Sequence, residues 1–118
     1  MDVFMPYKGG EDFIVQTLGV SALKRGNLRE EDVEGRLLSE CSPGYSAILQ
    51  DILQEVYKSQ ETKKLRFLYY QDDKLARLSN VRVVYDLEKV VLISELKYTM
   101  EKKYDGMEGF EIYDENKS

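Results

Sequence analysis

The alternation of residue types in the second half of the chain constrains its fold more than any other feature of the sequence. Bulky apolar residues recur at every second position in three segments, 64–70, 75–85 and 90–98. A period of two is typical of β-strands. The segments between them, 71–74 and 86–89, have the composition of tight turns. Together these segments predict three consecutive antiparallel strands, a β-meander.

A different period precedes this meander. Ser42 and Pro43 form a strong helix start, because the serine hydroxyl can accept a backbone hydrogen bond and the proline ring presets φ. Apolar residues then follow at helical spacing: Tyr45, Ile48, Leu49, Ile52, Leu53, Val56 and Tyr57. A stripe of this kind predicts an amphipathic helix with one buried face.

The first part of the chain is less regular. Residues 13–18 are rich in β-forming side chains and predict a strand, and a second short strand is expected over 20–24. Asn27, with Glu30 three residues later, has the spacing of a capping box. Gly35 suits the position that follows a helix C-terminus, so a short acidic helix is expected between them.

This order of elements predicts the fold class and the domain boundaries. We expect an α+β fold, in which a five-stranded antiparallel sheet carries short helices and one long helix on one face. The domain is expected to span residues 13–99. Residues 1–12, which contain one proline and two glycines, are expected to form an N-terminal arm, and residues 100–118 a linker toward a following domain.

Composition excludes several kinds of chemistry. The 118 residues include no histidine and one cysteine. A Ser-His-Asp triad, a histidine-ligated haem and most catalytic zinc sites therefore lack a required side chain, and we expect no metal site. The 22 acidic residues outnumber the 17 basic ones, which disfavours nucleic acid as a partner. The basic cluster Lys63-Lys64-x-Arg66 fits a solvated face better than a phosphate site.

The sequence also bears on location. No apolar run approaches the roughly 20 residues of a membrane-spanning helix, and the first residues lack the basic and apolar regions of a signal peptide. A single cysteine suits a reducing compartment. We therefore expect a soluble, cytoplasmic chain in which Cys41 is a packed side chain.

Three motifs, taken in order, resemble the PAS domain family. Leu28-x-x-Glu31-Asp32-Val33-x-Gly35-Arg36 is similar to the family's short-helix signature. Residues 43–57, followed by Glu61-Thr62-Lys63-Lys64, are similar to its long helix and the entry into the next strand. Residues 91–96 match the end of its closing meander. The resemblance covers residues 13–99 and is closest to PAS modules of microbial, especially archaeal, sensor histidine kinases.

The resemblance implies a function. The chain would be the sensor part of a two-component histidine kinase, without catalysis of its own, and would pass small shifts to the next domain. The output would run through Glu95, Leu96 and Lys97, which stand where many PAS domains have Asp, an aliphatic residue and Thr. The implied partners are a second copy, in a homodimer, and the adjacent domains of the parent chain.

The resemblance leaves the ligand open. Haem-binding members use a histidine, which is absent, and flavin photosensors have a Gly-Arg-Asn-Cys motif where Gly35-Arg36 is followed here by Leu37-Leu38. A small-molecule cavity between the long helix and the sheet would be lined by Tyr45, Ile48, Leu49, Ile52, Phe67, Tyr69, Leu92 and Ser94. The same residue types also suit plain core packing, so both interpretations remain open.

The second face of the sheet is another candidate surface. The alternate positions of the strands, which point to this second face, are apolar too. This implies that the N-terminal arm or a partner subunit covers the face, as in PAS homodimers. The expected members are Phe4, Leu68, Tyr70, Val84, Val91 and Ile93. Two alternatives remain: a ligand-free PAS-like dimerisation module, and a small α+β enzyme with a pocket, against which the missing histidine counts.

Overall fold

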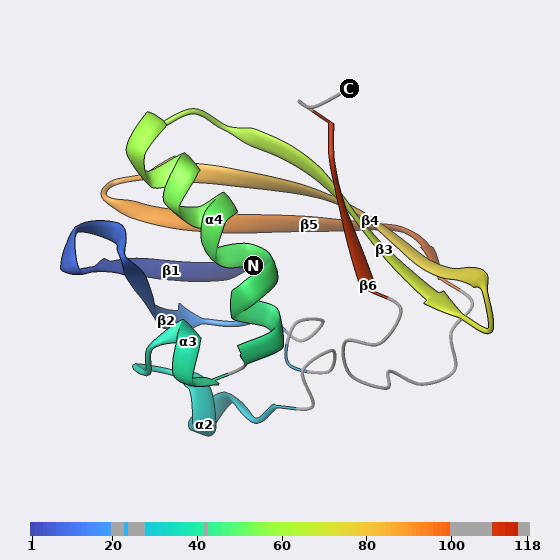
Figure 1. Cartoon of the computed structure of the whole chain (residues 1–118), viewed down its shortest axis with the longest axis horizontal. Helices are drawn as coiled ribbons and strands as arrows, with labels where there is room; N and C mark the ends of the chain where they lie inside the picture. Colours follow the sequence, from blue (N-terminus) through green and yellow to red (C-terminus); the bar gives the residue numbers. More distant parts are fainter. Residues whose placement is uncertain (20–22, 24–27, 42, 100–109, 116–118) are drawn as a thin grey trace.

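The computed structural model of the chain describes residues 1–19, 23, 28–41, 43–99 and 110–115, without the side chains of 43–46 and 48. These residues form a six-stranded antiparallel sheet that curls into a half-barrel (Figure 1). The elements are β1 (Asp2–Tyr7), the 3-10 turn η1 (Lys8–Gly10), β2 (Asp12–Thr17), α2 (Glu30–Val33), α3 (Leu38–Cys41), α4 (Pro43–Ser59), β3 (Lys63–Gln71), β4 (Lys74–Asp86), β5 (Lys89–Thr99) and β6 (Phe110–Asp114). The strand order in the sheet is β2-β1-β5-β4-β3-β6.

The expectation of a five-stranded α+β sheet with one long helix is wrong. A sixth strand, β6, pairs with β3 along Leu65–Tyr69 and forms the edge of the sheet. Among the residues that the structure describes, sheet outweighs helix, because α2 and α3 have four residues each and α4 has 17. In the sequence, β6 is five residues within the expected linker 100–118, and two inward apolar side chains are too short a pattern to separate a strand from a loop.

The N-terminal residues 1–12 form part of the sheet instead of an arm. β1 lies between β2 and β5, and Phe4 is completely buried in the core. The proline and glycines that suggested a frayed segment belong to a hairpin, in which Gly9 and Gly10 have φ of 72° and 99°. A Cβ at Gly10 would come within 2.8 Å of the Tyr57 ring of α4, so the hairpin packs closely on the helix.

The predicted helix and meander are confirmed. α4 begins at Pro43, as the sequence predicts, and Leu49, Leu53 and Val56 of its apolar stripe are buried. β3, β4 and β5 follow in antiparallel order. Their two turns have left-handed central residues, at 72–73 and at 87–88, which is the backbone pattern of type I′ hairpins.

The short acidic helix is confirmed in part. α2 begins at Glu30 with Arg29 as the N-cap residue, and Gly35 follows it with φ of 79°. The Gly35 N–H donates to the Val15 carbonyl, and the Val15 N–H donates to the Arg36 carbonyl, so the chain after α2 partly pairs with the edge strand β2. The expected cap at Asn27 and nearly all of the expected strand over 20–24 lie outside the described residues.

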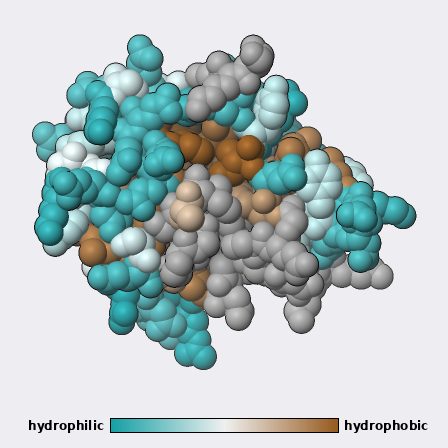
Figure 2. Space-filling model, viewed as in Figure 1, coloured by the Kyte–Doolittle hydropathy of each residue, from teal (hydrophilic) through white to brown (hydrophobic). Residues whose placement is uncertain are grey.

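The hydrophobic core lies between α4 and one face of the sheet, which we call the helix face. Figure 1 shows α4 in front of the sheet, with α2 and α3 beyond β2. Figure 2, from the same side, shows a mostly hydrophilic surface in which apolar side chains emerge between α4 and β6. The largest fully buried side chains are Phe4, Phe13, Leu38, Leu49, Leu53, Leu65 and Leu92. The helix face is therefore the packed side of the sheet.

Candidate functional site

The opposite face of the sheet, which we call the open face, is the candidate site. The register of the strands arranges its side chains in rows that cross β4 and β5. One row contains Arg66, Asn80 and Glu95, and the next contains Lys64, Arg82 and Ile93. The third row contains Val84, Val91 and Val3, and the fourth contains Asp86 and Lys89. A basic row therefore adjoins an apolar one.

The residues expected to line a ligand cavity are distributed mainly in the core. Leu49, Phe67, Tyr69 and Leu92 are buried, and Ile52 is half-buried. Ser94 is exposed, while the side chains of Tyr45 and Ile48 lie outside the described part. The buried positions suit core packing, and a ligand between α4 and the sheet stays a prediction.

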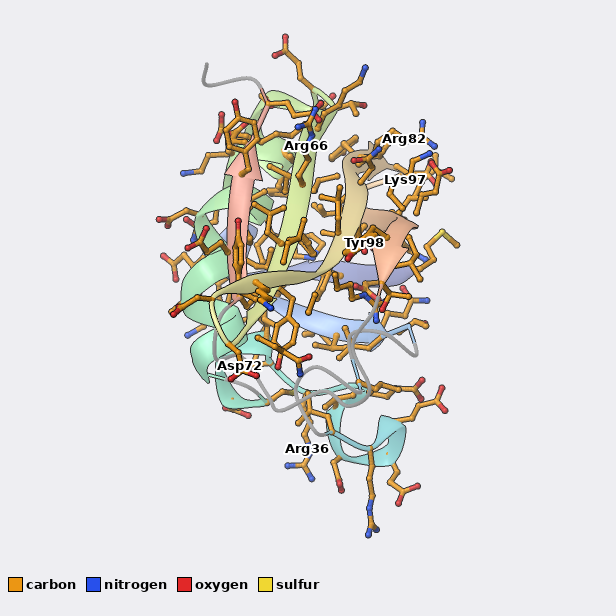
Figure 3. The ribbon with its side chains drawn as sticks, turned by 90° about the vertical axis from the view of Figure 1, so that its right-hand side faces the viewer. Arg36, Arg66, Asp72, Arg82, Lys97 and Tyr98 are labelled. Atoms are coloured by element: carbon orange, nitrogen blue, oxygen red, sulfur yellow. The ribbon has the colours of Figure 1, made fainter. Side chains whose placement is uncertain are left out.

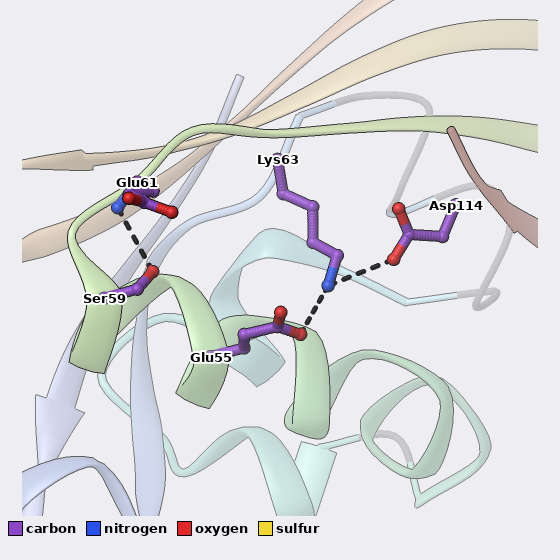
Figure 4. A network of polar contacts seen from close by, with 5 residues as sticks. All are labelled: Glu55, Ser59, Glu61, Lys63 and Asp114. Carbon is purple, nitrogen blue, oxygen red and sulfur yellow. Dashed lines mark hydrogen bonds and ion pairs between the residues drawn. The ribbon is translucent and has the colours of Figure 1, made fainter. Parts of the chain in front are cut away.

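A buried lysine holds β6 against the helix face. The Lys63 ammonium donates to Asp114 at 3.0 Å and to the Glu55 carboxylate, which joins β3 to β6 and to α4 (Figure 4). Close by, the Glu61 N–H donates to the Ser59 hydroxyl at 3.2 Å. Burial alone would lower the pKa of Lys63, but the hydrogen bonds and charges of the two carboxylates raise it above its ordinary value. Lys63 is therefore a charged structural clamp.

A polar hollow of about 400 Å³ lies on the open face. It is lined by Lys64, Leu65, Asn80, Val81, Arg82, Ile93, Glu95 and Glu115. Lys64 and Arg82 are cross-strand partners, so two positive charges stand directly opposite each other on β3 and β4. Like charges in this arrangement destabilise a sheet unless something neutralises them.

The carboxylates of the polar hollow are already bound to other cations. The Arg66 Nε donates to Glu115 at 2.7 Å, and the Lys97 ammonium donates to Glu95 at 2.8 Å. Within the described residues, no carboxylate forms an ion pair with Lys64 or Arg82. Figure 3 shows Arg66, Arg82 and Lys97 at the same end of the sheet, far from Asp72. This end is locally basic, although the whole chain has a net charge of -5.

A second, more apolar hollow of about 360 Å³ lies beside the first. It is lined by Met1, Val3, Gln16, Val84, Tyr85, Asp86, Lys89, Val91 and Ile93. Ile93 lines both hollows, so the two adjoin on the open face. We call the second one the apolar hollow.

The residues expected on the second sheet face are placed there with one exception. Leu68, Tyr70, Val84 and Ile93 are half-buried and Val91 is 9% exposed. Phe4 is a correction, because its register with Val15 and Val90 directs it into the core. Sequence reasoning missed Val3, Leu78, Arg82 and Tyr98, which share these rows. The alternation along each strand predicts which face each of these residues points to. Their neighbours on the adjacent strands depend on the register, which the sequence does not reveal.

The expected output corner lies near the end of β5. Leu96 is 48% exposed, and Glu95 is paired with Lys97 along the same strand. A register shift leaves Lys97 without a facing residue on β4, because Leu78 pairs with Tyr98 and Ser79 with Leu96. Such a bulge bends a strand locally.

Other kinds of site have little support in the structure. Among the residues it describes, no three His, Cys, Asp or Glu side chains gather as a metal ion would require. Cys41 is half-buried, its thiol donates to the Val33 carbonyl at 3.7 Å, and burial raises its pKa, so the reactive thiolate is disfavoured. None of the described helices is long and apolar enough to cross a membrane.

Comparison with protein-family models, curated proteins and solved structures finds no match to this chain. The functional argument therefore depends on the chain's own residues. The open face, with its two hollows, is the surface on which those residues concentrate charge and apolar area together.

Proposed function

We propose that the chain is a sensory signal-transduction module of the PAS type, the sensor part of a two-component histidine kinase, and that it pairs with a second copy through the open face. The order of β2, the short helices, α4 and the meander supports this proposal, since these elements underlie the resemblance, whereas β1 precedes the residues 13–99 that it covers. β6 lies outside that pattern. The lone, half-buried cysteine suits the cytoplasmic location that we propose with it.

The single observation that carries the pairing is the apolar row on the open face. Val3, Val84 and Val91 adjoin Ile93 on a face opposite to the one that α4 covers. A sheet face that meets only water normally carries polar residues at these positions. Val3 and Val84 are half-buried and Val91 is 9% exposed, so the row offers a partner a partly exposed apolar strip between charged rows.

Charge complementarity favours a second copy as the occupant. The apolar row of Val84 and Val91 lies between the rows of Arg82 and Asp86, each about 7 Å away along β4. A two-fold axis along the apolar row would therefore bring Arg82 of each copy over Asp86 of the other. Such an interface is self-complementary, as a symmetric dimer requires.

Sedimentation equilibrium of the purified chain tests this proposal. We expect a reversible dimer for the wild type and a monomer for Val84→Glu, because the new carboxylate would be desolvated at the centre of the interface. The matched control is Leu87→Glu, which introduces the same charge at an exposed turn and should leave the dimer intact. A wild-type monomer at every concentration, or a Val84→Glu dimer, would contradict the proposal.

A further inference from the structure

The geometry points to the polar hollow as a binding site for a small organic dianion, of the phosphate monoester class. This inference rests on the proposed sensory function, for which it names the chemistry of the signal. Its starting point is the pair Lys64 and Arg82, two cations directly opposite each other that no described carboxylate neutralises. Side chains in such positions have Cβ atoms about 5 Å apart, close enough to bind one anionic group together.

The donors in the polar hollow match a phosphate group. An Arg guanidinium binds two oxygens of a phosphate at once, and a Lys ammonium adds a compact positive charge. The Asn80 side chain lines the same hollow from the next row and can donate through its amide. Glu95 and Glu115 also line the hollow, but they repel a bound anion only weakly because Lys97 and Arg66 form ion pairs with them.

The size of the hollow indicates an organic group on the anion. About 400 Å³ lies within the range of small-molecule sites and exceeds the space that a free phosphate ion needs. Ile93 supplies an apolar wall at the border with the apolar hollow. A ligand with a dianionic head and a compact apolar body would fill both kinds of surface.

Binding of this kind would also affect the proposed dimer. In the two-fold arrangement, Asp86 of the second copy lies over Arg82, so an anion and that carboxylate compete for the same guanidinium. The ligand then binds the monomer more tightly than the dimer, which is the difference in affinity that any ligand-driven shift requires. The signal would be a change in the fraction of paired chains.

Isothermal titration of the wild-type chain with phenyl phosphate tests the inference, at a dilution where sedimentation shows monomer. We expect saturable binding that Lys64→Gln and Arg82→Gln each weaken at least tenfold. Lys74→Gln removes a cation from the exposed β3–β4 turn and should bind as the wild type does. Equal binding by all four proteins, or none by the wild type, would overturn the inference.

Thermal unfolding supplies a second readout. Because Lys64 and Arg82 repel each other, Lys64→Gln and Arg82→Gln should each melt at a slightly higher temperature than the wild type in phosphate-free buffer. Phenyl phosphate should raise the melting temperatures of the wild type and of the control Lys74→Gln, and should raise those of Lys64→Gln and Arg82→Gln less. If the wild type melts at a higher temperature than both Lys64→Gln and Arg82→Gln without phosphate, the claim that Lys64 and Arg82 repel each other is contradicted.

Further arms of the same experiment separate the sources of the phosphate group. Binding to vesicles that contain phosphatidic acid, without binding to phenyl phosphate, would show a lipid surface as the partner and overturn the inference. A chain that dimerises but does not bind phenyl phosphate would refute this inference and leave the proposed function standing. A chain that binds phenyl phosphate through Lys64 and Arg82 but never dimerises would refute the proposed pairing and leave the phosphate site standing.

Discussion

The replacement Lys63→Met tests how the sixth strand is held in the sheet. Methionine keeps the length and apolar stem of the lysine side chain and removes the ammonium group. The Lys63 side chain is almost fully buried, at 6% exposure, and its ammonium group binds two carboxylates of unequal burial. Asp114, at 16% exposure, lies in a largely dry position, whereas Glu55, at 56%, can turn toward water.

The expected cost follows from this difference in burial. Removing one partner of a fully buried ion pair costs about 3–5 kcal/mol, and an exposed pair contributes at most about 1 kcal/mol. The Lys63 clamp combines a largely buried contact with an exposed one, so we expect a loss of about 2–3 kcal/mol in the free energy of unfolding. For a chain of this size, that loss corresponds to a melting temperature lowered by roughly 8–12 °C.

Urea unfolding followed by circular dichroism measures this loss, and two further variants identify its origin. Glu55→Gln should cost less than about 1 kcal/mol, because it removes only the exposed contact. Lys63→Met combined with Asp114→Leu should recover at least half of the loss, because replacing a whole buried pair by apolar side chains is often close to neutral. The reasoning is refuted if Lys63→Met unfolds with the wild type, or if Glu55→Gln is equally damaging.

Three further perturbations test other parts of the fold. The stabilisation by Lys63, whose pKa is raised, is fully present below the ordinary lysine value of 10.5 and is lost as pH rises through the raised pKa; the stability difference between wild type and Lys63→Met should therefore shrink only in strongly alkaline urea titrations. Gly10→Ala should cost about 2 kcal/mol in chemical unfolding against about 1 for Gly9→Ala: both require a left-handed alanine, but only the former meets the ring on α4, so equal losses would contradict that contact. Leu87→Asn with Glu88→Gly should increase the free energy of unfolding by about 1 kcal/mol and so raise the melting temperature, because Leu87 and Glu88 have positive φ, which Asn and Gly adopt more readily; an unchanged transition would contradict a type I′ turn there.

The parts of the fold with long periodic patterns were predictable from the sequence. α4 has a helical stripe over its length and a proline start, and the meander alternates over three strands. β6 has only Phe110 and Ile112 to direct inward, and its third inward residue, Asp114, is held by charge. A strand that depends on a buried ion pair has no apolar pattern to reveal it.

For the candidate site, the sequence predicts which face of its own strand each residue occupies, but not which residues of neighbouring strands it meets. The alternation assigned Val84, Val91 and Ile93 to one face, and the structure places them there. The opposition of Lys64 and Arg82 depends on the register between β3 and β4, which hydrophobic pattern and turn geometry set together. The sequence of the basic cluster around Lys63 therefore indicates one solvated surface, although its alternate residues point to opposite faces of the sheet.

The pairing of two open faces is the central claim, and a charge exchange between its expected contacts tests it most directly. Arg82 and Asp86 are four residues apart on β4, about 13 Å within one chain, so they interact weakly unless two copies bring them together. Sedimentation equilibrium should show a weakened dimer for Arg82→Glu and for Asp86→Arg, and a restored dimer for the double variant. Additive losses in the double variant, or a wild type that stays monomeric, would contradict the claim.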